Sequence, residues 1–172
     1  MATRDQIDTP RLRSRPFVPD DAEAAFGWLG DSEVMRFFRN GPDGSVMDTS
    51  TRIARYIEHQ SAHGFSKWII CERTSEKPIG DAGLIVFPDS GKIDLGYRLA
   101  KPYWGTGFAT EIASAWIRAA FVDFQLTRLT AFAHPHNAAS LRVLKKVGFR
   151  AIGPEQVMGM DAITFSLDAP AP

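Results

Sequence analysis

Two glycines, Gly105 and Gly107, stand at the start of a segment whose apolar residues recur at the spacing of one helix face. The apolar positions are Ala109, Ile112, Ala113, Trp116, Ile117, Ala120 and Phe121. The first N–H groups of a helix have no partner within it, and the helix dipole adds positive charge there. Because glycine leaves these N–H groups uncovered, the pattern predicts a site for an anionic group such as a pyrophosphate, and so a nucleotide-bearing ligand.

Two common phosphate-binding motifs do not fit these glycines. A P-loop ends in Gly-Lys-Ser/Thr, whereas Gly107 is followed by Phe108 and Ala109. A Rossmann fingerprint has Gly or Ala where this chain has Thr110, and it needs an acidic residue at the end of a second parallel strand. The acidic residue nearest to that place, Asp123, ends the helix instead. The sequence therefore argues against both motifs.

The segment before the glycines, residues 92–99, alternates strictly, as a strand does. One face carries Ile93, Leu95, Tyr97 and Leu99, and the other carries Asp94, Gly96 and Arg98. A glycine inside a strand marks a bulge or the close approach of a ligand. Taken alone, the segment favours the simpler interpretation of a half-buried strand whose Asp94–Arg98 face is solvated.

Asn137 and Ser140 stand three residues apart at the start of another predicted helix, and Gly148 follows its end. Asn, Ser and Gly at these places are ordinary helix caps. Residues three apart also share a helix face, so a second interpretation directs both side chains toward a ligand along the preceding strand.

Other residues with chemical potential have simpler interpretations. His134 and His136 flank a proline without a cysteine or acidic cluster nearby, which argues against a metal site. Cys71 lies in an apolar strand-like run and is expected to be an inert core thiol. Aromatic residues early in the chain are expected in the core by default, but their nearness to a Gly/Pro/Asp loop allows a role in lining a pocket. These residues are Trp28, Phe37 and Phe38.

The composition is that of an ordinary globular chain. Its 172 residues fit one domain, and its 20 Lys and Arg balance its 20 Asp and Glu. No global field therefore favours nucleic acid or an anionic membrane. No apolar run approaches the ~20 residues of a membrane span, and the N-terminus lacks a secretory signal. We expect a cytoplasmic protein with neither nucleic-acid nor membrane partners.

The elements that must position these residues alternate between helices and strands. Strands are predicted near 10–18, 65–72, 78–87, 92–100, 128–133, 149–153 and 158–167. Helices are predicted after Pro19, in a short segment over 32–38, after Asp48, over 106–123 and over 137–147. A hairpin turn at 88–91 makes its two strands antiparallel. The fold class is therefore α+β, a single domain over residues 1–172, with flexible ends at 1–9 and 168–172.

In order along the chain, these parts resemble the GCN5-related N-acetyltransferase (GNAT) superfamily. The resemblance rests on Pro78-Ile79-Gly80, Asp94-Leu95-Gly96-Tyr97-Arg98-Leu99, Tyr103-Trp104-Gly105-Thr106-Gly107-Phe108-Ala109-Thr110-Glu111, and the stretch from Asn137 to Phe149. The residues and spacing of the last two motifs are most similar to those of the RimJ/RimL-type ribosomal-protein N-terminal acetyltransferase branch. The resemblance implies a mostly antiparallel mixed sheet with splayed central strands and helices on both faces.

The resemblance also implies acetyl transfer from acetyl-CoA, as cosubstrate and without a metal, to a primary amine by direct attack. The acceptor could be a protein or peptide N-terminus, or a small amine such as a polyamine, an amino acid or an aminoglycoside. A non-catalytic acyl-CoA-binding or sensing domain, and a nucleotide-binding module of another kind, are the alternatives. Either a monomer or a homodimer is compatible with the sequence.

Site roles follow from the resemblance and from physical needs. Asp94 is the candidate base, and Ser140 is the candidate hydroxyl beside the departing thiolate. The acceptor pocket would use Trp28, Phe37 and Phe38. Pyrophosphate would rest on backbone N–H groups, and pantetheine would pair like an extra strand. The residues expected to bind the cofactor are Leu95, Gly96, Tyr97, Arg98, Leu99, Trp104, Gly105, Thr106, Gly107, Phe108, Ala109, Thr110, Asn137 and Ser140.

Overall fold

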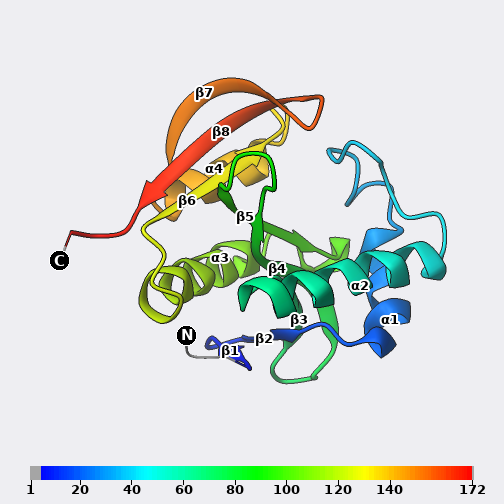
Figure 1. Ribbon diagram of the computed structural model, residues 1–172. Coiled ribbons are helices and arrows are strands. Elements are labelled where there is room, and N and C mark those ends of the chain that lie inside the picture. The colour runs from blue at the N-terminus through cyan, green and yellow to red at the C-terminus, as the bar shows by residue number, and fades with distance from the viewer. Residues whose placement is uncertain (1–4, 172) are drawn as a thin grey trace.

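One eight-stranded sheet, in the order β1-β2-β3-β4-β5-β6-β8-β7, organises the computed structural model, which describes residues 5–171 (Figure 1). Neighbouring strands are antiparallel except for β5 and β6, which are parallel. The strands are β1 (Ile7–Asp8), β2 (Leu12–Pro16), β3 (Lys67–Glu72), β4 (Pro78–Val86), β5 (Ile93–Leu99), β6 (Arg128–Ala133), β7 (Arg150–Val157) and β8 (Met160–Asp168). The predicted α+β class and mostly antiparallel sheet are confirmed.

Four α-helices cover this sheet, as the alternating sequence predicts. They are α1 (Ala22–Leu29), α2 (Val46–His63), α3 (Phe108–Arg118) and α4 (Ala138–Lys146). Successive residues of β3 point to opposite faces of the sheet and so show which helices lie on which face. Ile69 packs in one core cluster with α1 and α2. Ile70 packs in the other cluster, with α3 and α4. The helices therefore lie in pairs on the two faces of the sheet.

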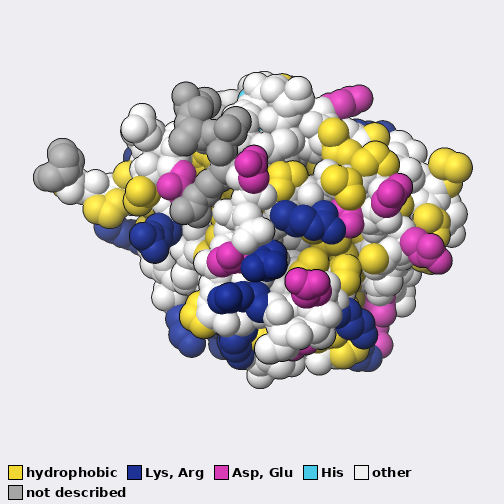
Figure 2. Space-filling view, turned by 90° about the horizontal axis from the view of Figure 1, so that it is seen from below, with side chains coloured by type: hydrophobic (Ala, Val, Ile, Leu, Met, Phe, Trp, Pro, Cys, Tyr) yellow, Lys and Arg dark blue, Asp and Glu magenta, His cyan; other side chains and the backbone are white. Residues whose placement is uncertain are grey.

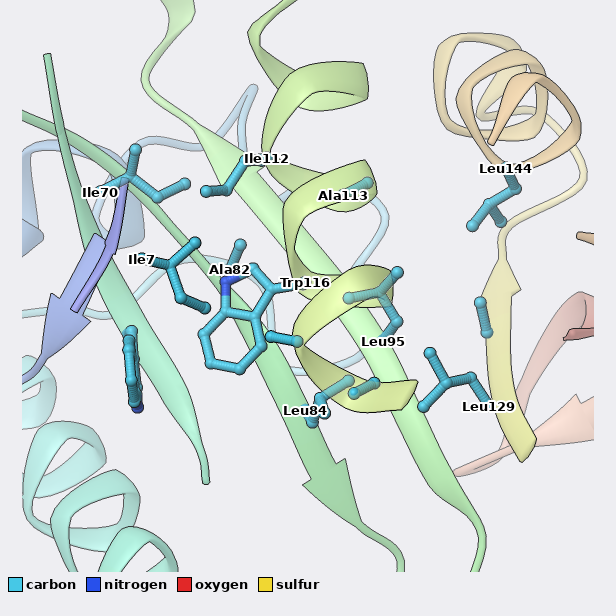
Figure 3. Packing of buried hydrophobic residues seen from close by; sticks show 14 of the residues in the cluster. Ile7, Ile70, Ala82, Leu84, Leu95, Ile112, Ala113, Trp116, Leu129 and Leu144 are labelled. Atoms are coloured by element: carbon cyan, nitrogen blue, oxygen red, sulfur yellow. The ribbon is translucent and has the colours of Figure 1, made fainter. Parts of the chain in front are cut away.

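The larger core cluster lies between α3 and the sheet. Figure 3 shows Trp116 of α3 projecting toward Ile7, Ile70 and Ala82, which come from three different strands. The Trp116 ring meets the Trp68 ring edge-on, with centroids 4.9 Å apart. Aromatic pairs prefer this edge-to-face geometry. This packing fixes α3, and so the glycine turn before it, against β4 and β5.

The cap residues and a histidine fix α2 at both ends. Ser45 accepts a hydrogen bond from the backbone N–H of Asp48, and Gly64 ends the helix in a left-handed conformation. His59 accepts a hydrogen bond from the N–H of Val86 through Nε2, and its Nδ1 contacts the carbonyl oxygen of Phe65 at 2.9 Å. These bonds join α2 to the end of β4.

The structure differs from the sequence-based expectations in four places. In the segment 168–172, expected to be flexible, Asp168 ends β8 and pairs with Arg128, and the Ala169 N–H donates to the carbonyl oxygen of Thr127; residue 172 lies outside the described part. Within the segment 1–9, expected to be flexible, Ile7 and Asp8 form β1, because Ile7 is buried in the core; residues 1–4 lie outside the described part. The short helix expected over 32–38 contains only turns. The helix expected over 106–123 begins at Phe108, and its last five residues, Ala119–Asp123, form a π-helical turn.

Within residues 5–171, no helix is both long enough and apolar enough to cross a lipid bilayer. Figure 2 shows the face seen from below in Figure 1, where basic and acidic side chains are interspersed with apolar ones. This mixture agrees with the balanced charge of the whole sequence.

Candidate active site

The central strand β5 has a full-length neighbour on one side only. It pairs with β4 at seven positions, from Ile93 to Leu99. Its other neighbour, β6, pairs with it at one position, Asp94 opposite Thr130. Beyond that pair the two strands diverge, and no described strand pairs with this edge of residues 95–99. The expected splaying of the central strands is confirmed, and it leaves backbone groups of β5 available to a ligand.

The turn after β5 contains the two glycines of the predicted anion site. Gly105 and Gly107 have φ angles of +71° and +83°, and a Cβ on Gly105 would meet nothing within 4 Å. Residues with side chains rarely adopt this conformation, whereas glycine does so readily. Gly107 is the N-cap of α3 and offers no capping side chain. The first N–H groups of α3 are therefore uncovered, as the sequence predicts.

Hydrogen bonds and burial hold the other residues of this turn. The indole N–H of Trp104 donates to the carbonyl oxygen of Leu99 at 2.8 Å, which ties the turn to the end of β5. The Thr106 hydroxyl donates to the carbonyl oxygen of Tyr103 at 2.7 Å, and the Phe108 ring is buried. This turn, residues 104–108 and called the cradle below, is thus anchored to β5 by Trp104 and to the core by Phe108.

A contact that the sequence did not predict braces this cradle from the N-terminal hairpin. Glu111 of α3 accepts hydrogen bonds from the Thr9 hydroxyl at 2.6 Å and from the Arg11 backbone and guanidinium at 2.9 and 2.7 Å. Arg11 also donates to the carbonyl oxygen of Thr106 at 2.9 Å and lies over the Phe108 ring. Burial opposes ionisation of Glu111, but these bonds hold the pKa of its carboxyl below its usual range.

The helix α4 meets β5 through Ser140. Its hydroxyl lies 3.1 Å from the hydroxyl of Tyr97, and burial raises the pKa of Tyr97 to about 12. Asn137 is the N-cap of α4 and accepts a hydrogen bond from the backbone N–H of Ser140. Asn137 therefore has the capping role, whereas Ser140 lies beside β5. The capping bond uses only Oδ1 of Asn137, so the second interpretation, in which both side chains face a ligand, stays a prediction.

The face of β5 opposite α3 is charged but not solvated, which corrects the simpler interpretation of its alternation. Asp94 and Arg98 are each 8% exposed, and Tyr56 of α2 contacts Arg98. Arg98 forms an ion pair of 2.7 Å with Asp81 of β4 and donates to the Tyr56 hydroxyl of α2 at 2.8 Å. Burial works against the charge of Arg98, but Asp81 outweighs it and raises the pKa of the guanidinium.

Lys67 of β3 lies on the same face and reaches across two strands. Its ammonium donates to the carbonyl oxygen of Gly83 at 3.2 Å, and a Cβ on Gly96 would lie 2.4 Å from Nζ. Burial lowers the pKa of Lys67 to about 8 and raises the pKa of Asp94 to about 8. Because Gly96 has no side chain, it also leaves room for the Lys67 ammonium. The sequence did not indicate this second role of the glycine.

The segment between α1 and α2 closes over this face, where the acceptor pocket is predicted. The Phe37 ring stacks on His134 at the end of β6, with centroids 5.1 Å apart. The Phe38 ring lies 5.2 Å from the Arg98 guanidinium. Figure 1 shows this segment beside the turn between β7 and β8. In agreement, a Cβ on Gly159 in that turn would lie 3.6 Å from the Arg39 guanidinium carbon.

Of the three aromatic residues expected in the pocket, the structure separates one from the others. Trp28 of α1 is 1% exposed and packs in the core cluster that α1 and α2 share. Its indole N–H donates to Asp81 at 2.7 Å. Its predicted role as a pocket wall does not fit this burial, because a fully buried ring has no free surface. Phe37 and Phe38 lie at the surface segment described above, and Phe38 is 38% exposed.

The remaining candidate groups have the following surroundings. Cys71 is buried and forms no disulfide, and burial raises the pKa of its thiol. The rings of His134 and His136 lie 5.4 Å apart, and the backbone N–H of His136 donates to Nδ1 of His134. No group of three metal-ligating side chains occurs within the described range.

Three residues of this arrangement, Lys67, Asp81 and Arg11, are not evident as site residues from the sequence. Asp81 had a signal, since it is an acidic residue inside a strand of apolar and small residues. Lys67 and Arg11 had none, because their partners Gly96 and Glu111 lie 29 and 100 residues away along the chain.

Comparisons with known proteins agree with this arrangement. The sequence profile of the acetyltransferase (GNAT) domain matches residues 11–150. The N-acetyltransferase YoaA of Bacillus subtilis is 29% identical over 149 residues, which cover 86% of this chain and 84% of YoaA.

Solved structures share the fold at low identity. A ribosomal-protein-S5-alanine acetyltransferase from Vibrio fischeri superposes with a TM-score of 0.77 and 18% identity, over 95% of this chain and 96% of that one. An aminoglycoside acetyltransferase, AAC(6')-Ib in complex with coenzyme A, has a TM-score of 0.75 and 19% identity, over 91% and 94%. Together with the profile match, which spans most of the sequence, these findings show that the chain belongs to the GNAT acetyltransferase family and is an N-acetyltransferase.

Proposed function

We propose that this enzyme acetylates the α-amine of a protein or peptide N-terminus, as in the RimJ/RimL-type branch that its motifs resemble. The observation that carries the proposal is the position of β5 between two unlike surfaces. One side leads to the backbone cradle at Gly105 and Gly107, and the other carries the buried Asp94. A donor bound on the first surface would meet an amine bound on the second at the diverging edge of β5.

The cofactor half consists mainly of backbone. When bound, acetyl-CoA supplies its acetyl group as an activated thioester. The N–H groups at the start of α3 suit the negative charge of a pyrophosphate, and each charge-assisted bond contributes ~1.5–3 kcal/mol. The free edge of residues 95–99 suits the amides of pantetheine, in the manner of an added strand. A backbone N–H near Gly96 or Tyr97 would polarise the thioester carbonyl.

The acceptor half consists of side chains. Asp94 would take the proton of the amine. Its raised pKa of about 8 makes its ionised form a stronger base than an ordinary carboxylate, and the share of that form increases as the pH rises toward 8. The α-amine of a peptide has a pKa of ~8, whereas an alkylammonium lies near 10, so an N-terminal amine loses its proton more readily. Phe37 and Phe38 would contact the first residues of the peptide, and the Ser140 hydroxyl would donate to the departing sulfur.

The test is release of free thiol from acetyl-CoA with a panel of acceptors. The panel holds peptides with different N-terminal residues, their N-formylated forms, spermidine, free amino acids and an aminoglycoside. We expect turnover with some free peptides and none with the formylated controls. Turnover with a small amine only would identify the small-molecule alternative. Binding of CoA without turnover on any amine would favour the sensing domain.

A further inference from the structure

The side chain of Lys67 spans the sheet at the start of the diverging edge. Lys67, Gly83 and Gly96 stand opposite one another in β3, β4 and β5. The ammonium passes over Gly83, to which it donates a hydrogen bond at 3.2 Å, and lies above Gly96. A methyl group at position 96 would come within 2.4 Å of Nζ. Since residues two apart in a strand share a face, the ammonium lies on the face that carries Asp94.

The Asp94 carboxyl needs a compensating charge. It is 8% exposed, and its Oδ1 has no hydrogen-bond partner in the part of the chain that the structure describes. Burying a carboxylate without hydrogen bonds is costly unless an opposite charge lies nearby. Two cations face this region, Lys67 from β3 and Arg98 from β5 itself.

Only one of the two cations is available to Asp94. Arg98 gives its guanidinium to Asp81 through three contacts of 2.7 to 3.1 Å and to Tyr56. Lys67 forms no ion pair within 4 Å among the described residues, and its one hydrogen bond goes to a neutral carbonyl. His59 of α2 and Asp81 of β4 also face Lys67. The His59 ring is neutral, because its Nε2 accepts a hydrogen bond from the Val86 N–H, and Asp81 is already paired with Arg98. The charge of Lys67 is therefore the one that balances Asp94.

We propose that Lys67 is a positioning residue for catalysis, whose positive charge favours the ionised form of Asp94, the form that can accept a proton. The inference rests on the proposed function, in which Asp94 is the base. Asp94 takes the proton that the amine nitrogen loses as its bond to the acetyl carbon forms. The bond from that carbon to sulfur breaks with its electron pair on sulfur, which then receives a proton. Lys67 itself takes no part in the proton transfer.

The direction of the effect follows from the surroundings of Asp94. Burial raises the pKa of its carboxyl to about 8, and the charge of Lys67 and the Thr130 hydroxyl oppose that rise. Without the ammonium the pKa rises further, so a larger share of Asp94 is protonated at pH 7. A protonated carboxyl cannot act as a base. Loss of the charge should therefore move the acidic limb of the activity profile to higher pH.

The experiment compares pH profiles of kcat/KM for the wild type, Lys67→Met, Lys67→Gln and Lys67→Arg. Both neutral variants should move the acidic limb upward by at least about one pH unit, which is roughly a tenfold loss at pH 7 that recovers at high pH. Lys67→Arg should keep the limb of the wild type. Unmoved limbs in both neutral variants, or an equal shift in Lys67→Arg, would overturn the proposal.

A second measurement follows the protonation of the Asp94 carboxyl without turnover. The carbon-13 shift of its carboxyl, assigned with Asp94→Asn, is titrated by NMR in the wild type and in Lys67→Gln. We expect a higher pKa in the variant, and an unchanged pKa contradicts the inference. Failure of the proposed function looks different, because the wild type would then turn over no amine. Suppose instead that the wild type is active, that Asp94→Asn is inactive, and that the acidic limbs of the wild type and of the neutral Lys67 variants coincide. Only the role of Lys67 is then wrong.

Discussion

The two faces of β5 have opposite chemistry although they belong to the same seven residues. The face toward α3 carries Leu95 and Leu99, which pack into the larger core. The face toward α1 and α2 carries Asp94 and Arg98, which are also buried but charged. On the first face, burial of apolar surface holds a cradle made of backbone. On the second, buried charges must be balanced by partners from other strands and helices.

This difference separates scaffold from chemistry. A site made of backbone N–H groups tolerates changes in side chains as long as the glycines keep their conformation. A site made of buried charges depends on each partner, because removing one leaves the other uncompensated. Substitutions on either face test this difference, and they follow in order of expected effect.

Asp94→Asn should have the largest effect on turnover. The amide has nearly the same shape but cannot accept the proton of the amine, and loss of a general base lowers kcat by about 10²- to 10⁴-fold. CoA affinity should stay the same, since the cradle lies on the other side of β5. Steady-state kinetics and calorimetric titration of CoA measure the two quantities. Wild-type kcat in this variant would contradict the assignment of the base.

Asp81→Asn should have the largest effect on stability. It leaves the Arg98 guanidinium buried without its ion-pair partner, and such changes cost about 3–5 kcal/mol of unfolding free energy. The matched control is Glu33→Gln, which removes an exposed ion pair with Lys101 and should change stability by less than about 1 kcal/mol. Urea denaturation measures both. Equal losses would mean that burial of the charged face does not matter.

Gly105→Glu should weaken CoA binding about 100-fold, through repulsion of the pyrophosphate and loss of charge-assisted bonds of ~1.5–3 kcal/mol each. A Cβ fits at this position, so the cost in packing is small. Gly91→Glu is the control, because Gly91 has a similar φ of +66° and equally open surroundings in the hairpin turn. Unchanged CoA affinity in folded Gly105→Glu would place the pyrophosphate elsewhere.

Phe38→Ala should have the smallest effect, an increase in the KM of the acceptor by about tenfold, equivalent to ~1.4 kcal/mol, with little change in stability. Trp28→Ala should do the reverse. Its ring is fully buried, and its loss should cost ~3–5 kcal/mol of unfolding free energy. Thermal unfolding and acceptor kinetics on both variants separate the two roles. A Phe38→Ala variant with normal KM would place the acceptor toward the strands around Val157 to Thr164.

Much of the fold could be predicted because its patterns are local. The alternation over 92–99 and the helical spacing after Gly107 correspond to β5 and α3 within two residues at their starts. The strand β1 escaped prediction because it is two residues long and carries one core side chain, Ile7. The turns over 32–38 escaped because only Val34 and Met35 among their apolar residues are buried, and the bond from the Met35 N–H to the Asp31 carbonyl oxygen is not repeated along the segment to form a helix.

The candidate site could be predicted only in its backbone half. The positive φ angles of Gly105 and Gly107 agree with glycines in a turn, since glycine adopts this conformation readily, whereas their role in binding an anion stays a prediction. Asp94 is a candidate base from its sequence position, but its burial is not predictable there, since a strand's alternation shows which residues share a face and not what covers that face. The incorrect pocket role of Trp28 has the same cause.

The order of the main elements, the conformation of the glycine turn and the family of the chain depend on residues close together in the sequence, so the sequence alone was sufficient to predict them. The tertiary structure was needed to show that Lys67, Asp81 and Arg98 share one buried face with Asp94. Their contacts join segments from three strands, and α1 and α2 supply the cover that excludes water. Charge and pKa depend on that cover and on distances in space, neither of which spacing along a chain contains.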